Sequence, residues 1–89
     1  MEGIRHLKDL ILRNNSIAEL SRESFASIPE LQNLDLSENL LTILRSGTFS
    51  HLQKLHELRL ERNKIESVEK GAFEAKIDSV MLDGQLLNE

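Results

Sequence analysis

Asparagine recurs in this chain at a fixed interval, and that interval restricts the possible fold more than any other feature of the sequence. Asn15, Asn39 and Asn63 stand 24 residues apart. Each lies in the same frame of apolar residues, which is clearest in residues 31–44 as Leu-x-x-Leu-x-Leu-x-x-Asn-x-Leu-x-x-Leu. A fixed period in the twenties indicates an array of repeats, in which each repeat buries its apolar residues against the next.

The frame occurs four times, the fourth copy being weaker and carrying Gln85 in place of the asparagine. Phe25, Phe49 and Phe73, the only aromatic residues, keep the same 24-residue step. The step from the phenylalanine to the start of the next copy is six residues for Phe25 and Phe49, but it is four residues from Phe73 to Ile77. We therefore expect a shorter return path after Phe73. We predict one domain whose coils span approximately residues 7–30, 31–54, 55–76 and 77–89, with residues 1–6 as the end of a preceding coil.

The residues between the leucines indicate what each coil does. Leu34, Asp35 and Leu36 alternate apolar and polar, which is typical of a strand with one buried face, and a polar turn follows them. Stacked coils place such strands side by side in a parallel sheet, and the connection should be right-handed. The predicted fold class is therefore α/β: a right-handed solenoid, or horseshoe arc, with short parallel strands on the concave face and turns or short 3₁₀ helices on the convex face.

The recurring asparagines have a structural explanation. Where the chain bends inward after each strand, its backbone donors and acceptors need partners. An amide side chain both donates and accepts, so a stacked column can join one bend to the next. We predict a ladder made by Asn15, Asn39, Asn63 and, with a longer arm, Gln85. The alternative is that these are ordinary turn asparagines.

Composition and charge limit the classes of function. The net charge of −4 argues against a nucleic-acid ligand, since nucleic-acid binders normally carry a basic patch. No apolar run approaches the roughly 20 residues of a membrane span, so we expect no direct membrane insertion. The chain contains no cysteine, which excludes disulfides and thiol chemistry.

The ends of the chain suggest a piece of a longer array. Ile4 and Met1 occupy the slots of Ile28 and Phe25, so the chain starts inside a repeat without a recognisable cap. We therefore expect a fragment with uncapped ends, through which it could self-associate. Residues 1–5 do not resemble a secretory signal. Asn14 begins an Asn-x-Ser glycosylation sequon, which matters only if the chain is secreted.

No arrangement of residues predicts catalysis. His6, His51 and His56 are scattered and form no obvious triad or metal set with the acidic residues. We expect no catalytic residues, no metal and no cofactor, and we interpret the phenylalanine column as core rather than as a ligand site.

The form LxxLxLxxNxLxxLxxxxFxxLxxL, best seen in residues 31–54, resembles the "typical" subfamily of leucine-rich repeats. That subfamily occurs mainly in extracellular proteins, among them Toll-like receptors, Slit-like guidance ligands, small matrix proteoglycans and neuronal adhesion receptors. The resemblance covers essentially the whole chain. It implies a module that binds a protein ligand through its concave face and lies outside the cell or on its surface.

By resemblance, the ligand-binding positions are exposed and flank the strand leucines. They are Asp9, Ile11, Arg13, Asn33, Asp35, Ser37, Glu57, Arg59, Glu61, Ser79, Met81 and Asp83. Stacking should place Asp35 beside Arg59, and we expect an exposed ion pair between them. Acidic residues outnumber basic ones in the set, which favours a basic partner.

Three hypotheses follow. The first is a protein-recognition segment of an extracellular or receptor ectodomain. The second is a structural spacer that sets the curvature of the array. The third is a small cytosolic scaffold, which is the expectation for a stand-alone chain without a signal peptide.

Overall fold

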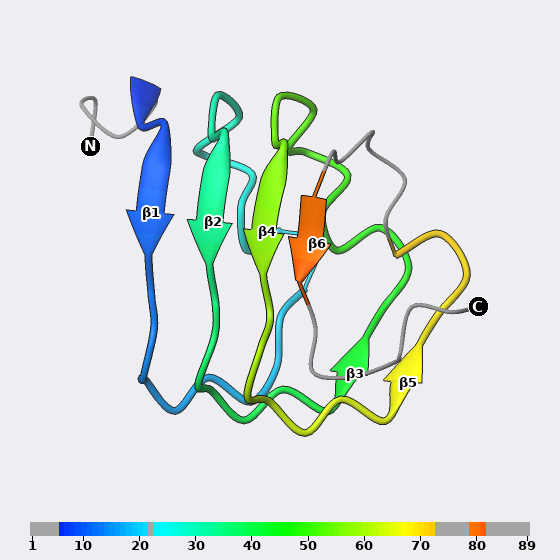
Figure 1. Cartoon of the computed structure of the whole chain (residues 1–89). Helices are drawn as coiled ribbons and strands as arrows, with labels where there is room; N and C mark the ends of the chain where they lie inside the picture. The colour runs from blue at the N-terminus through cyan, green and yellow to red at the C-terminus, as the bar shows by residue number, and fades with distance from the viewer. Residues whose placement is uncertain (1–5, 22, 73–78, 82–89) are drawn as a thin grey trace.

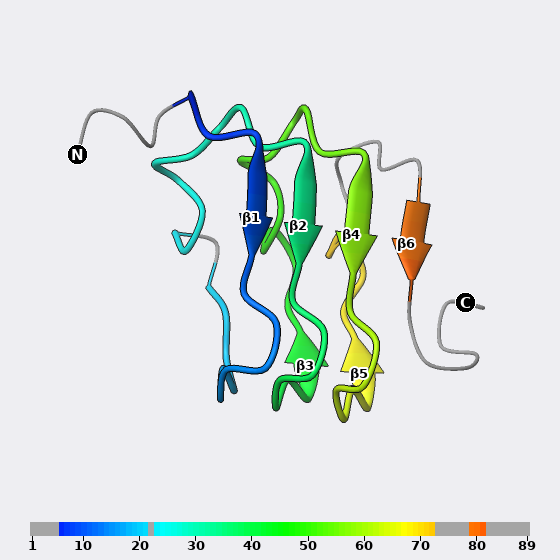
Figure 2. The same ribbon diagram turned by 60° about the vertical axis from the view of Figure 1, so that its left-hand side comes forward.

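The computed structural model describes residues 6–21, 23–72 and 79–81 and shows coils stacked side by side as a right-handed solenoid (Figure 1). Each coil contributes one short strand to a four-stranded sheet, and Figure 2 shows the strands in succession. The strands are β1 (Asp9–Ile11), β2 (Asn33–Asp35), β4 (Glu57–Arg59) and β6 (Ser79–Met81), in that order across the sheet. All three pairings are parallel, as the leucine-rich repeat solenoid requires.

The register of the sheet keeps the repeat frame. Leu10, Leu34, Leu58 and Val80 are aligned across the four strands and form its inward-facing row. The first two steps between aligned residues are 24 residues long, and the third, from Leu58 to Val80, is 22. The strands therefore stay in line although the third coil is shorter. The predicted division of the chain into coils at approximately residues 7–30, 31–54, 55–76 and 77–89 stays a prediction.

A second, smaller sheet lies beyond the bends, away from the four-stranded sheet (Figure 1). It joins β3 (Ile43–Leu44) to β5 (Ser67–Val68) in parallel. Sequence reasoning missed this pair because two residues are too few to show alternation. The rest of the described return paths consists of turns and irregular chain, and within the described residues there is no α-helix.

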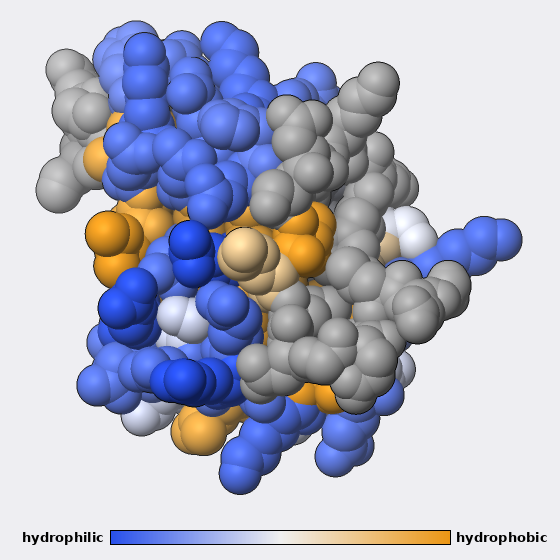
Figure 3. Space-filling model, in the orientation of Figure 1, coloured by the Kyte–Doolittle hydropathy of each residue, from blue (hydrophilic) through white to orange (hydrophobic). Residues whose placement is uncertain are grey.

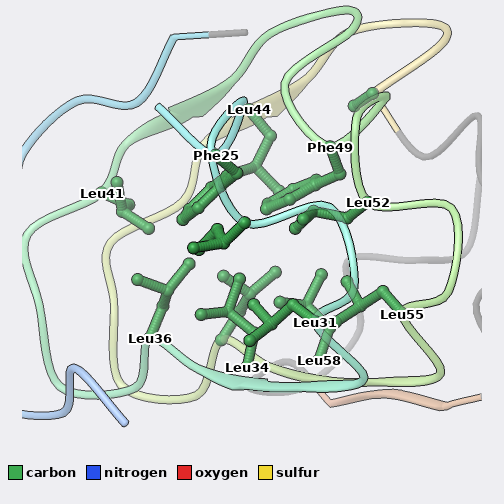
Figure 4. Packing of buried hydrophobic residues seen from close by; sticks show 13 residues of the cluster. Phe25, Leu31, Leu34, Leu36, Leu41, Leu44, Phe49, Leu52, Leu55 and Leu58 are labelled. Carbon is green, nitrogen blue, oxygen red and sulfur yellow. The ribbon is translucent and has the colours of Figure 1, made fainter. Parts of the chain in front are cut away.

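The core lies between the strands and the return paths of the central coils. Leucines of the second and third coils close around Phe25 and Phe49, whose rings stack with centroids 5.9 Å apart and planes inclined by 17° (Figure 4). The buried hydrophobic residues are Phe25, Ile28, Leu31, Leu34, Leu36, Leu41, Leu44, Phe49, Leu52, Leu55, Leu58, Leu60 and Ala72. Burial of each leucine contributes about 1.5–3 kcal/mol of hydrophobic free energy before conformational entropy is subtracted.

The first coil is less well covered than the second. Its frame residues are only partly buried and pack against the edge of the core; they are Leu7, Leu10, Leu12, Ile17 and Leu20. β1 pairs on one side only among the described strands, so these side chains receive packing from one neighbouring coil instead of two. Among the described residues, no helix has the length and apolar composition needed to cross a bilayer.

Candidate binding face on the four-stranded sheet

The outer face of the four-stranded sheet, which points away from the core and carries the residues predicted for the concave binding face, contains a shallow hollow of about 360 Å³. Its walls come from three successive strands and the turn after β1; the lining residues are Asp9, Leu10, Ile11, Arg13, Asn33, Leu34, Asp35, Glu57 and Arg59. Side chains alternate between the two faces of a strand, so the first and third residues of each strand point outward. The register aligns Asp9 with Asn33 and Glu57, and Ile11 with Asp35 and Arg59. The repeat thus brings seven of the twelve predicted binding residues to one hollow.

Asp35 is the most constrained residue of this face. It was expected to be exposed, as was Ser37, but only 8% of Asp35 and 6% of Ser37 is accessible. Asp35 Oδ1 accepts hydrogen bonds from the Ser37 hydroxyl at 2.6 Å and the Ser37 N–H at 3.0 Å. Its Oδ2 accepts one from Arg13 Nη2 at 3.0 Å. Burial alone would raise the pKa of Asp35, but these donors outweigh it, and the pKa lies below its ordinary value of 3.8.

The predicted ion pair between Asp35 and Arg59 is wrong. Although the two residues are aligned in neighbouring strands, Asp35 pairs with Arg13 of the preceding coil. Arg59 instead faces two carboxylates of its own coil: its Nε lies 3.4 Å from Glu57 and its Nη1 lies 3.6 Å from Glu61. Alternate residues of a strand share a face, so Glu57 meets Arg59 without crossing to another strand.

The outer face of the sheet also has apolar side chains, of which Ile11 lines the hollow. Ile11 is 71% exposed, the highest value among the exposed large hydrophobic residues of the described chain, and Met81 at the other end of its row is 36% exposed. Figure 3 shows a largely hydrophilic face with a hydrophobic spot over its β1 side and further hydrophobic surface near the middle of the view. Asn33 donates its amide to Asp9, which fixes both side chains at that edge. A ligand here would meet charge, amide and hydrocarbon within one hollow.

A second hollow of about 290 Å³ adjoins the ends of the strands. It is lined by Arg13, Ser37, Glu38, Glu61 and Arg62, so Arg13 and the turns after β2 and β4 border it. Arg62 Nη1 donates to Glu38 Oε2 at 3.2 Å across one coil step. Ser37 and Glu61 thus lie here rather than in the first hollow. Of the remaining predicted residues, Ser79 is placed only by its backbone in β6, and Asp83 lies outside the described residues.

The asparagine side chains join successive bends. Asn39 Oδ1 accepts from the backbone N–H groups of Asn15 and Ile17, each at 3.1 Å, in the preceding coil. Its Nδ2 reaches the carbonyl of Leu12 in that coil at 3.0 Å, and that of Leu36 in its own coil at 3.0 Å. One amide therefore satisfies donors and acceptors in two coils.

Asn63 repeats the arrangement one coil later. Its Oδ1 accepts from the N–H of Leu41 at 3.0 Å, and its Nδ2 donates to the carbonyl of Leu36 at 2.9 Å. Asn15 bonds within its own bend, donating to the carbonyl of Leu12 at 2.9 Å. Gln85, the fourth predicted member, lies outside the described residues.

The residue before each ladder asparagine has left-handed backbone geometry, which the sequence did not reveal. The φ angles of Asn14, Glu38 and Arg62 are 61°, 58° and 61°. Asparagine tolerates this conformation, but glutamate and arginine occupy it at a cost. The 24-residue spacing was the available signal, since a shared repeat position implies a shared backbone conformation. Asn14, the sequon residue, is exposed on this turn, and its glycosylation stays a prediction.

The histidines do not gather on this face. His6 lies 3.5 Å from Glu30, while His51 and His56 are exposed elsewhere. Within the residues that the structure describes, no group of three or more histidine or acidic side chains could hold a metal ion. The charged, amide and apolar side chains of this face are suited to binding.

Comparison with known proteins agrees with the geometry. A family model described as "Leucine rich repeat" matches residues 5–65, which is more than half of the chain. The chain belongs to the leucine-rich repeat family. Eight chains of solved structures match it, whereas a search of curated protein sequences gives no match. One of the eight is a chain of the TLR13–ssRNA13 complex, with a TM-score of 0.78 and 36% identity. The match covers 85% of this leucine-rich repeat chain but 11% of that chain.

This match corrects the expectation that nucleic acid is excluded as a ligand. The matching repeats belong to a protein whose structure was determined in complex with single-stranded RNA. Net charge is a property of a whole chain, whereas a ligand meets only a local set of side chains. A net charge of −4 on this leucine-rich repeat segment therefore does not exclude a nucleic-acid ligand, and the exclusion was wrong.

Proposed function

We propose that the chain is a protein-recognition segment of a receptor-type or extracellular leucine-rich repeat ectodomain, and that it binds through the outer face of its four-stranded sheet. The hollow that spans β1, β2 and β4 carries this proposal, because it assembles outward-pointing residues of three coils into one surface. Charged, amide and apolar groups together give a surface that can select a partner by shape and polarity.

Membership of the leucine-rich repeat family and the 36% identity with the TLR13 chain support a receptor-type origin. The match spans only 11% of the TLR13 chain. The partner and the location are therefore proposals for this segment and are not taken from the whole TLR13 protein. A cell-surface or extracellular location is part of the proposal. The spacer and cytosolic-scaffold hypotheses are its alternatives.

A second candidate is recognition of single-stranded RNA, which the TLR13–ssRNA13 match favours. The hollow that spans β1, β2 and β4 is less favourable to it, since its lining includes three acidic residues, Asp9, Asp35 and Glu57, and two arginines, Arg13 and Arg59. Phosphodiester ligands require cationic contacts, and their affinity falls with added salt.

The test is a binding screen in which the 89-residue chain is multimerised artificially to raise its avidity. The panel contains secreted and cell-surface proteins and a single-stranded RNA oligonucleotide. Each hit is then measured with an Ile11→Asp/Arg59→Ala double variant. The matched control is Arg45→Ala/His51→Ala, which changes one arginine and one exposed residue away from the four-stranded sheet. Loss of binding in the first variant alone supports the proposal. Equal binding of a protein by both variants would place the contact outside this face and overturn the proposal. The absence of any protein hit would favour the spacer reading, and RNA as the sole hit would favour the second candidate.

A further inference from the structure

We infer that Arg13 receives a carboxylate of the protein ligand, and that Asp35 and Ser37 are positioning residues that hold it ready for this contact. The inference rests on the proposed function and specifies the partner's chemistry. Neither the family match nor the structural match assigns a role to any of these three residues.

The first observation is a chain of contacts that runs from the buried interior to the surface. Ser37 donates twice to one oxygen of Asp35, and Arg13 donates to the other. Asp35 is buried, while the side chain of Arg13 is 53% exposed. One end of the guanidinium is therefore fixed by a buried, fully bonded carboxylate, and its remainder faces the solvent.

The second observation is the donor capacity left on Arg13. A guanidinium carries five N–H donors in a planar fork. In the part of the chain that the structure describes, the bond to Asp35 engages one of its nitrogens, Nη2. A planar fork already fixed in orientation matches a carboxylate and loses little freedom when it binds one.

The contrast with Arg59 identifies Arg13 as the receiving group. Glu57 and Glu61 flank Arg59 on both sides, so an incoming anion would meet two like charges. Arg13 borders both hollows of the face, and a ligand in either one can reach it.

The surroundings favour a protein carboxylate over a phosphodiester. Asp9, Glu57 and Glu61 lie on the same face, and an RNA strand would bring one further negative charge with every nucleotide. A protein segment with a single carboxylate brings only one negative charge and is therefore repelled less. Ile11, two residues before Arg13 and highly exposed, offers an apolar contact in the same hollow. The partner segment should therefore present one acidic group beside an aliphatic side chain at this point, which differs from the basic partner that the overall excess of acidic residues in the binding set favours.

The test uses nuclear magnetic resonance of the ¹⁵N-labelled 89-residue chain, following the Arg13 side-chain N–H and the backbone amides of β1. The probes are sodium acetate, an acetylated and amidated Leu-Asp-Leu peptide, the neutral Leu-Asn-Leu peptide, a Leu-Leu peptide with a free C-terminal carboxylate, and a single-stranded RNA oligonucleotide. We expect saturable shifts centred on Arg13 with acetate and with the carboxylate peptides. The neutral peptide should bind at least tenfold more weakly. The relative affinities of the Leu-Asp-Leu and Leu-Leu peptides distinguish a side-chain carboxylate from a terminal one.

Three variants separate specific contact from general charge. Arg13→Lys keeps the charge but loses the fork, and should weaken peptide binding about tenfold. Ser37→Ala removes one hydrogen bond to Asp35 with little change in volume, and should weaken it about threefold while the spectrum stays dispersed. Arg45→Lys, an exposed ion-paired arginine away from the four-stranded sheet, should change nothing.

Equal affinity in Arg13→Lys, or shifts spread evenly over all arginines, would overturn the inference, as would tighter binding of RNA than of the acidic peptides. The two proposals can fail separately. If Arg13 binds carboxylate but Ile11→Asp/Arg59→Ala leaves partner binding intact, the proposed function fails. If that double variant abolishes partner binding and Arg13→Lys does not affect it, only the role of Arg13 fails.

Discussion

The first and second coils have nearly the same sequence pattern but different physical situations. In the second coil, Leu34 and Leu36 are at most 1% exposed, whereas Leu10 and Leu12 in the same slots of the first coil are only partly buried. The second coil is packed between two described neighbours, and the first has a described neighbour on one side. The contribution of a repeat residue to stability therefore depends on its position in the stack as much as on its identity.

The ladder asparagines show the same contrast. Asn39 is 4% exposed and bonds to both its own coil and the preceding one, while Asn15 is exposed and its side chain bonds within its own bend. A motif match gives these two residues equal weight, but packing does not. Substitutions at equivalent slots can measure the difference directly.

The largest expected difference is between Leu34→Ala and Leu10→Ala. Leu34→Ala opens a cavity in the core and should lower the free energy of unfolding by about 2–5 kcal/mol. Leu10→Ala removes a side chain that is already partly solvated, and it should cost clearly less. Urea unfolding followed by circular dichroism measures both, with m values compared to check the unfolded state. Equal losses would show that the first coil is as well packed as the second.

The second-largest difference in unfolding free energy is expected between Asn39→Ala and Asn15→Ala. Asn39→Ala removes the acceptor of the Asn15 and Ile17 N–H groups and one donor to each of the Leu12 and Leu36 carbonyls, and it should cost about 1–3 kcal/mol. Asn15→Ala exposes its former partners to water and should cost under about 1 kcal/mol. Amide hydrogen exchange adds a local test, since the N–H of Ile17 should exchange faster in Asn39→Ala. Unchanged protection of that amide would argue against the ladder as a joint between coils.

Asp35, the buried acidic residue of the second coil, should make the free energy of unfolding depend on pH. The folded-state pKa of Asp35 is lowered below that of the unfolded chain, so its contribution is present above about pH 4 and is lost as pH falls through the folded value. At neutral pH, Asp35→Asn should cost about 1–3 kcal/mol, and the difference from the native sequence should shrink below pH 4. Urea titrations between pH 7 and pH 2 measure it. A difference that is constant with pH would mean that Asp35 contributes by packing rather than by charge.

The smallest effect concerns the left-handed turns. Asn14 suits its backbone and Glu38 does not, so placing the first coil's residue in the second coil by Glu38→Asn should stabilise the chain. We expect about 0.5–1 kcal/mol, reduced by loss of the exposed pair with Arg62. Glu38→Gln is the control, because it loses the charge but keeps the conformational cost. A melting temperature that rises equally in both variants would assign the effect to charge.

The periodic features of the chain were predictable from sequence because they depend on local chemistry. The spacing of Leu34, Leu36 and Asn39 requires a strand and a bend, and three copies in register require stacking. The buried phenylalanine pair follows from the same arithmetic. The family itself could be identified on these residues.

The partners of charged side chains were not predictable in the same way. Alignment of Asp35 with Arg59 in neighbouring strands suggested an ion pair, but side-chain length and the two glutamates next to Arg59 decide the outcome. The burial of Asp35 depends on Ser37 and Arg13, which belong to different coils. The exclusion of nucleic acid failed for a related reason, since it used the charge of the whole chain to judge one surface.

The step from β4 to β6 is two residues shorter than the two steps before it, yet Leu58 and Val80 remain in line. The four-stranded sheet therefore keeps its frame while the connection behind it changes length. The sheet side of such a chain keeps its strand register, and the side formed by the return paths tolerates changes in length. Insertions and deletions can accumulate in the return paths without moving the residues that face a ligand, so new loops can be added there while an existing binding surface stays intact.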